Sequence, residues 1–221
     1  MSRIAPIILG LLLLTTNAFA ADALPRVLIL GDTIYNGVSR SVATELKGKA
    51  QVVWVRAGDT SDTLANLDKL LGDAKWDVIH FNLGLADLHY KDPATKTIRA
   101  MSKYAGGVRV TTKEQYEKNL RELVKRLQAT QARLIWASTT PITSSQFDNI
   151  YDPGSEVEFN SIAARIMAEH KVPLNDIHAF VLESRGDKKA PNPLDFKGIE
   201  LHRPIISVIQ NELAKAATAN R

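Results

Sequence analysis

The chain contains no cysteine among its 221 residues. Disulfide bonds, thiolate-bound metals and cysteine nucleophiles are therefore excluded. Aromatic residues make up only 6% of the chain, and its charge surplus is small, with 28 Lys and Arg against 24 Asp and Glu. Because the basic residues form no run, the sequence does not predict nucleic-acid binding, which needs a focused basic surface. The composition is otherwise that of a globular protein, 45% hydrophobic and long enough to bury a substantial core.

Residues 1–20 have the features of an export signal. Arg3 gives a positive start, residues 7–14 form an apolar run, and Ala-Phe-Ala ending at Ala20 matches a signal-peptidase site. The apolar run is too short for a transmembrane helix, which needs about 20 residues, and no cysteine follows it to carry a lipid. We expect cleavage near Ala20, a secreted or periplasmic product, and no stable membrane anchor after cleavage. A buried N-terminal helix is the alternative.

Residues 21–221 alternate short apolar runs with amphipathic stretches, which predicts a single α/β domain. The expected strands are 26–30, 51–55, 76–83 and 133–137, and the expected helices are 36–47, 63–71, 113–128, 157–170 and 204–216, with only a weak apolar segment at 179–182. This alternation predicts a doubly wound three-layer sandwich with a central parallel sheet. The irregular stretches 89–112 and 141–155 would then follow strand ends, where such folds bind ligands.

The turn after the first expected strand is the first candidate site. It reads Gly31-Asp32-Thr33-Ile34-Tyr35-Asn36-Gly37 and places a hydroxyl at a helix N-terminus, where backbone N–H groups can hold an anion or an oxyanion. Asp32 or Thr33 could instead simply cap the helix. A phosphate-binding turn is a third interpretation, but the segment lacks a glycine-rich cradle and a Lys–hydroxyl pair at P-loop spacing.

The segments that follow successive strands resemble the SGNH (GDSL-like) hydrolase family. Gly31-Asp32-Thr33 with Gly37 is similar to its Gly-Asp-Ser-x-x-x-Gly pattern, and Gly58-Asp59-Thr60 to its oxyanion-hole glycine block. The segment Asn82-Leu83-Gly84-Leu85-Ala86-Asp87 resembles its Gly-x-Asn-Asp block, which reads Asn-x-Gly-Leu-His-Asp in one bacterial branch. Further similarity to that branch, in the same order, covers residues 76–82, 116–123, 134–141 and 159–167.

This resemblance implies a serine-esterase mechanism that needs no metal or organic cofactor. A serine attacks an acyl ester, a histidine oriented by an aspartate activates it, and backbone N–H groups with an asparagine hold the oxyanion. The implied partner is a small molecule or glycan that carries an acyl ester. In this chain the resemblance assigns a nucleophile and oxyanion donor to Thr33 and a second oxyanion donor to Gly58. The implied site lining is Asp32, Asn82, Gly84, Ala86 and Asp87.

Two departures from the family pattern fall on positions that would carry the chemistry. Thr33 stands in place of the nucleophilic serine, and its extra methyl group restricts χ1 and crowds the attacking hydroxyl. Ala86 stands in place of the oxyanion asparagine, and the loss of such a donor typically costs about 10²–10³ in rate.

The segment before the final helix is a third departure, and it aligns with the family's Asp-x-x-His block in three ways. In the favoured register, Lys197 and Glu200 replace the aspartate and the histidine. In the second register, His202 is the base and Glu200 could orient it. In the third, Asp195 and Phe196 stand on the family's His-Phe. Only the second register retains a base, so the catalytic candidates are Thr33, His202 and Glu200, and the favoured register predicts an incomplete triad.

The remaining histidines form no metal-ligand pattern. His80 lies in the third apolar run and is interpreted as a hydrogen-bonded core residue, whereas His89 is interpreted as a surface residue near the mouth of the site. No pair of histidines has i, i+4 helical spacing, so no metal site is expected.

The sequence leaves two functions open. The first is a secreted acyl-ester hydrolase of the SGNH family with a degenerate site, acting on an ester of a sugar or lipid. The alternative is a non-catalytic member of the fold that binds a glycan or a protein. In either case we expect Thr33, Gly58, Asn82 and Ala86 to converge on one cleft at the carboxyl ends of the strands.

Overall fold

The computed structural model describes residues 23–95, 99–144, 147–186 and 195–219, and the predicted export signal lies outside these ranges. Five strands within them form one parallel sheet in the order β2-β1-β3-β6-β7. The strands are β1 (Arg26–Gly31), β2 (Gln51–Arg56), β3 (Val78–Phe81), β6 (Arg133–Ala137) and β7 (Leu174–Asn175). Because β1 lies between β2 and β3, the winding of the sheet reverses there, and this reversal opens a crevice at the carboxyl ends of the strands.

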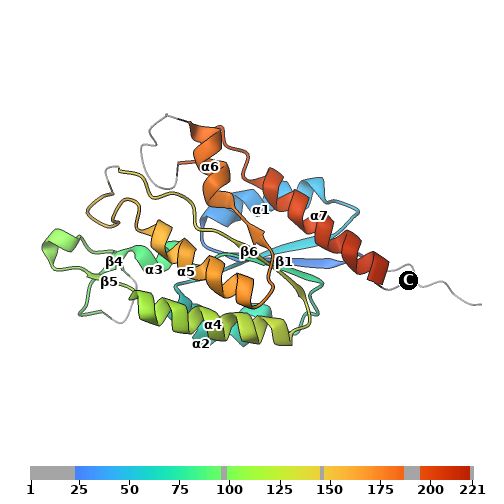
Figure 1. The fold of residues 1–221 in the computed structure, drawn as a ribbon, viewed down its shortest axis with the longest axis horizontal. Coiled ribbons are helices and arrows are strands. Elements are labelled where there is room, and N and C mark those ends of the chain that lie inside the picture. Colours follow the sequence, from blue (N-terminus) through green and yellow to red (C-terminus); the bar gives the residue numbers. More distant parts are fainter. Residues whose placement is uncertain (1–22, 96–98, 145–146, 187–194, 220–221) are drawn as a thin grey trace, which may run out of the picture.

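Helices cover both faces of this sheet (Figure 1). One face carries α2 (Thr60–Leu71), α4 (Lys113–Ala129) and α5 (Glu156–Glu169); the other carries α1 (Ile34–Glu45), α6 (Ile177–Arg185) and α7 (His202–Ala219). The predicted doubly wound three-layer sandwich is therefore confirmed. Among the described residues, no helix combines the length and the hydropathy that a membrane crossing requires.

The hydrophobic pattern explains the central elements. The apolar residues of β1 are fully buried and alternate between the two faces, with Leu28 and Leu30 in one cluster and Val27 and Ile29 in the other. A strand that is buried on both faces reads as a continuous apolar run. Helix α4 instead buries one stripe at helical spacing. The buried apolar residues of that stripe are Tyr116, Leu120, Leu123, Val124 and Leu127.

The shorter elements differ from the expectations. The third strand covers only 78–81, residues 179–182 lie within α6, and α7 begins at His202 rather than at Pro204. The sequence pattern does not predict β7, α3 (Leu85–Leu88) or the hairpin of β4 (Tyr90–Lys91) and β5 (Val108–Arg109) with its 3-10 turn at Lys103–Ala105. Elements of two to four residues contain too few positions for a periodic signal, and tertiary contacts decide their conformation.

Candidate functional site

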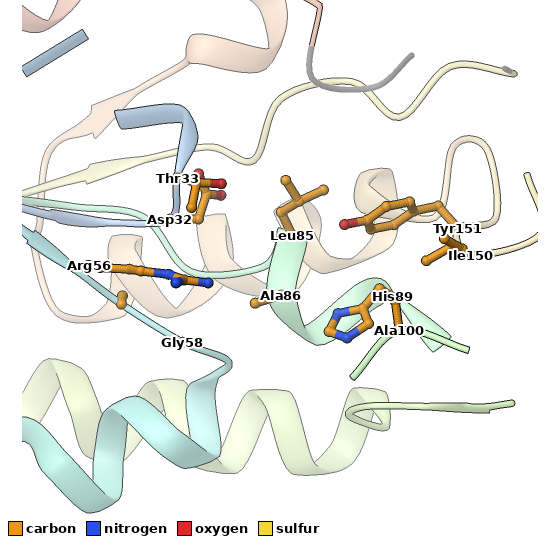
Figure 2. Close-up of a pocket in the computed structure, with 11 residues that line it drawn as sticks. Asp32, Thr33, Arg56, Gly58, Leu85, Ala86, His89, Ala100, Ile150 and Tyr151 are labelled. Atoms are coloured by element: carbon orange, nitrogen blue, oxygen red, sulfur yellow. The ribbon is translucent and has the colours of Figure 1, made fainter. Parts of the chain in front are cut away.

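A pocket of about 250 Å³ opens at the carboxyl edge of the sheet, where β1 and β2 end (Figure 2). Segments that directly follow three neighbouring strands build most of it, and the two irregular stretches complete it. The lining residues are Asp32, Thr33, Arg56, Ala57, Gly58, Leu85, Ala86, His89, Ala100, Ile150 and Tyr151. The pocket therefore lies where the strand order predicts a ligand site.

The turn after β1 presents Thr33 to this pocket. A side chain at Gly31 would place Cβ 2.7 Å from Cδ2 of Tyr35, so this close approach requires glycine. The Asp32 carboxylate accepts a hydrogen bond from the Ile34 N–H at 2.8 Å. Thr33 itself is exposed, and its hydroxyl makes no capping hydrogen bond. Asp32 thus satisfies the first turn of α1, and the Thr33 hydroxyl is left for a ligand.

The charge of Asp32 is set by its surroundings. Burial raises the pKa of Asp32 from 3.8 to about 6, against the opposing effects of the Ile34 N–H and the positive charge of Arg56. Burial, together with the charge of Asp32, raises the pKa of Tyr151 to about 12. The pocket therefore contains one carboxyl group that titrates below neutral pH and one phenol that keeps its proton.

The end of β2 contributes Arg56 and Gly58. The Arg56 side chain extends from the strand into the pocket, on the side of Asp32 and Ala86 (Figure 2). A side chain at Gly58 would collide with the Asp62 carboxylate. The turn is fixed by Asp59, which caps α2 by accepting the N–H groups of Ser61 and Asp62, both at 2.9 Å.

The segment after β3 places only part of the predicted lining in the pocket. Ala86 lines it and presents a methyl group with no hydrogen-bond donor. Asn82 lies behind the wall, because its Nδ2 donates to the Ala137 carbonyl at 2.8 Å and to Thr139 Oγ1 at 3.2 Å. Gly84 packs against the Thr139 side chain. The structure thus brings Thr33, Gly58 and Ala86 together, but it does not bring Asn82 or Gly84 to them.

Asp87 also lies behind the wall, where it links α3 to the start of α2. Its carboxylate accepts the Thr60 N–H at 3.0 Å and the Thr60 hydroxyl at 2.6 Å. Complete burial raises the pKa of Asp87 to about 7, against these hydrogen bonds. Asp87 therefore holds in place the segment that carries Gly58 and does not itself line the pocket.

The residues proposed for the base lie away from Thr33. His202 Nε2 is 3.1 Å from Glu45 Oε1, at the other end of α1. Glu200 is exposed and pairs with Arg203 at 2.7 Å. Asp195, the candidate of the third register, accepts the Lys197 N–H at 3.0 Å. None of these side chains belongs to the pocket lining, and no register brings a described base to the Thr33 hydroxyl.

The pocket also contains residues outside the site lining that the resemblance implies. Arg56 could have been found, because it ends a strand at the ligand-binding edge of the sheet. His89 is 7% exposed rather than on the surface, and its ring lies edge-on to Tyr151 with centroids 6.3 Å apart. Tyr151 and Ala100 come from the irregular stretches, whose path the sequence does not give.

The other histidines have structural surroundings. His80 is fully buried, and its Nε2 lies 3.1 Å from the amide nitrogen of Asn175, which confirms its interpretation as a core residue. Burial lowers the pKa of His80 to about 3, so it is neutral. His178 Nε2 lies 3.1 Å from the buried Glu156 carboxylate. Within the described ranges, no group of three or more His, Asp or Glu side chains could hold a metal ion.

Comparison with known families agrees with this geometry. The sequence model of the GDSL-like lipase/acylhydrolase family matches residues 20–202. The chain belongs to this family. The match includes the three segments after β1, β2 and β3 that line the pocket. Thr33 and Ala86 therefore lie in the frame of a GDSL-like acylhydrolase.

Solved structures of similar fold include other members of the GDSL-like group. A lipase/acylhydrolase from Enterococcus faecalis is 18% identical, with a TM-score of 0.62 over 85% of this chain and 96% of that one. A GDSL-like lipase from Bacteroides thetaiotaomicron is 17% identical, with a TM-score of 0.59 over 86% and 88% of the two chains. The acetyl xylan esterase AlAXEase is 15% identical, with a TM-score of 0.60 over 86% and 98%. No curated protein matches the sequence. At these identities the likeness shows the fold.

Proposed function

We propose that this protein binds an acyl ester of a sugar or lipid in the pocket beside Thr33, and that it accelerates hydrolysis of the ester little or not at all. Membership of an acylhydrolase family supports the ligand class. One protein of similar fold is described as an acetyl xylan esterase, which favours an acylated sugar.

The observation that carries this proposal is the separation of Thr33 from His202, the imidazole that the second register assigns as the base. His202 pairs with Glu45 instead, at 3.1 Å, so this imidazole is not placed to take the proton of the Thr33 hydroxyl. Ala86 provides no side-chain donor for an oxyanion. Members of a catalytic triad act as a unit, so the loss of the base removes most of the rate enhancement. A shaped pocket without that base favours binding over turnover.

We further propose that the protein reaches this ligand outside the cytoplasm, because residues 1–20 have the pattern of an export signal. The mature N-terminus of the protein, recovered from the periplasm or the medium after expression of the full chain, should lie near Ala21. An N-terminus at Met1 in the cell pellet would contradict export.

Hydrolysis and binding test the proposal separately. We expect wild type and Thr33→Ala to hydrolyse p-nitrophenyl acetate at indistinguishable rates. We also expect acetylated xylo-oligosaccharides to bind the wild type in calorimetry, and Ala86→Trp, which fills the pocket, to abolish that binding. Ala179→Trp, an exposed position on α6, is the matched control.

Three outcomes would change the conclusion. Hydrolysis by the wild type far above that of Thr33→Ala would make the protein an active esterase. Equal binding of acetylated and deacetylated sugars would favour a glycan-binding function without acyl recognition. Absence of binding to any acyl ester would overturn the proposal.

A further inference from the structure

Arg56 brings a positive charge into the pocket without a partner for it. It is exposed, and within the described part of the chain it makes no hydrogen bond or ion pair. Some other arginines of the described residues are paired, such as Arg109 with Asp152 and Arg121 with Glu117 at 3.0 Å, whereas Arg40, on the surface of α1, forms no ion pair. A guanidinium has five donors in a planar fork, and one that extends into a pocket is suited to bind an oxyanion of a ligand.

The nearest candidate partner within the protein, Asp32, does not pair with Arg56. The Asp32 carboxylate accepts the Ile34 N–H at 2.8 Å, which holds it in the turn, and it forms no ion pair with Arg56. Its pKa of about 6 means that burial, which disfavours its charge, outweighs the attraction of Arg56. Arg56 is therefore close enough to act on Asp32 through space but keeps its donors free.

The rest of the pocket lining favours a ligand with a single negative charge. Arg56 is the one Lys or Arg among the lining residues that the structure describes, and Asp32 is the one Asp or Glu. Below about pH 6, where Asp32 is neutral, the single guanidinium balances one negative charge of a ligand but not two. Leu85, Ala86 and Ile150 provide the apolar part of the lining.

We propose that Arg56 binds a carboxylate of the ligand, so that the pocket selects acidic acyl esters. This inference rests on the proposed function and specifies its substrate class. The carboxylate could belong to the sugar, as in an acetylated uronic acid, or to the acyl group, as in the half-ester of a dicarboxylic acid. Both present the same planar group to the Arg56 fork.

The test compares each acid with its neutral carboxamide, which has nearly the same shape. The sugar arm uses O-acetylated glucuronic acid and O-acetylated glucuronamide, and the acyl arm uses monomethyl succinate and methyl succinamate. Calorimetry at low ionic strength should show the acid of one arm binding about tenfold or more tightly than its amide, as expected for a hydrogen-bonded charge pair. The arm that shows this preference identifies which part of the ligand carries the carboxylate.

Arg56→Gln should abolish the preference and leave the affinity for the amide within about twofold. Arg40→Gln removes one charge from the exposed face of α1 and should keep the preference. The dependence on salt is a further test on the wild type. Raising the ionic strength from about 0.01 M to about 1 M shortens the Debye length from about 30 to 3 Å, and it should weaken the binding of the acid more than the binding of the amide.

The failures can be distinguished. If acid and amide bind the wild type equally, or if Arg56→Gln weakens both alike, the carboxylate inference is overturned and the proposed function stands. If no ligand of either arm and no acetylated xylo-oligosaccharide binds, the proposed function is overturned, and the inference with it.

Discussion

His202 Nε2 lies 3.1 Å from Glu45 Oε1, so the imidazole of the first residue of α7 pairs with the last residue of α1, whereas Thr33 precedes the first. His202 lines a hollow with Gly37 and Ser41 of α1, and it does not belong to the pocket that Thr33 lines. In this arrangement His202 stabilises the contact between α1 and α7 and does not reach the Thr33 hydroxyl.

We therefore expect His202→Ala to leave the hydrolysis of p-nitrophenyl acetate unchanged. The loss of the ion pair should lower the free energy of unfolding by less than about 1 kcal/mol, because Glu45 is 55% exposed and exposed ion pairs contribute little; the loss of packing of the His202 ring, which is 19% exposed, adds to this. Glu200→Gln, which breaks an exposed pair with Arg203, is the matched variant. Loss of activity in the histidine variant alone would show that His202 reaches Thr33, and would establish the register in which it is the base.

Thr33→Ser should not create strong esterase activity. The change removes a methyl group that crowds the hydroxyl, but Ala86 still gives no oxyanion donor, and the His202 imidazole still pairs with Glu45. Because the missing donor alone typically accounts for about 10²–10³ in rate, we expect kcat/KM for p-nitrophenyl acetate to stay near background. A rise of several orders of magnitude would mean that a base is present.

Affinity for an acidic ligand should rise as the pH falls through about 6, where Asp32 becomes neutral and stops repelling the ligand carboxylate. Arg56 from β2, Tyr151 and His89 also face this part of the pocket. Asp32→Asn keeps an acceptor for the Ile34 N–H and should flatten the pH dependence in calorimetry. His89→Gln should retain it. An unchanged profile in Asp32→Asn, flattened instead in His89→Gln, would assign the effect to the histidine.

Asp87 should make the protein less stable at high pH. Its pKa is about 7 when folded against 3.8 for a free aspartate, so its contribution is fully present below about pH 4 and is lost as the pH rises through 7. As the pH rises from 4 to 8, the free energy of unfolding in urea should rise for Asp87→Asn relative to wild type by on the order of 2–4 kcal/mol. Asp68→Asn, at a carboxylate that is 91% exposed, should show no such gain. Parallel pH profiles for wild type and Asp87→Asn would contradict the burial argument.

Asp152 should control the order of the hairpin beside the pocket. Its carboxylate accepts the Tyr90 hydroxyl and the Lys103 ammonium, both at 2.7 Å, and pairs with Arg109. We expect Asp152→Asn to raise amide hydrogen exchange of the hairpin about tenfold, equivalent to about 1.4 kcal/mol. Glu158→Gln breaks an exposed pair with Lys113 and serves as the control. Equal exchange in both variants would show that the backbone alone holds the hairpin.

The sequence predicts the parts of the molecule that depend on local pattern. The apolar run of β1 and the stripe of α4 give the layers, and the position of Thr33, Gly58 and Ala86 directly after strands brings them to one edge. These inferences need only strand direction and periodicity, which a chain of this length shows clearly.

The remaining site residues depend on contacts between distant segments. Tyr151 reaches the pocket because the Tyr90 N–H donates to the Ile150 carbonyl at 2.9 Å, a pairing that neither segment encodes alone. Asn82 turns away because the Ala137 carbonyl at the end of β6 is available to its side chain. The partner of His202, Glu45, lies at the opposite end of the sequence, and helical phase alone cannot identify it.

The Asp152 contacts also bear on how the specificity of this protein could be engineered. The hairpin and the segment 147–152 are also joined by backbone hydrogen bonds. The Tyr90 N–H donates to the Ile150 carbonyl at 2.9 Å and the Lys103 N–H to the Asn149 carbonyl at 2.8 Å, in addition to the contacts of the Asp152 carboxylate. Grafting either loop from a relative would leave the other without its backbone partners. A successful graft must therefore transfer both loops as a pair, with the acidic residue and its three donors matched, and libraries that vary one loop alone should yield few folded clones.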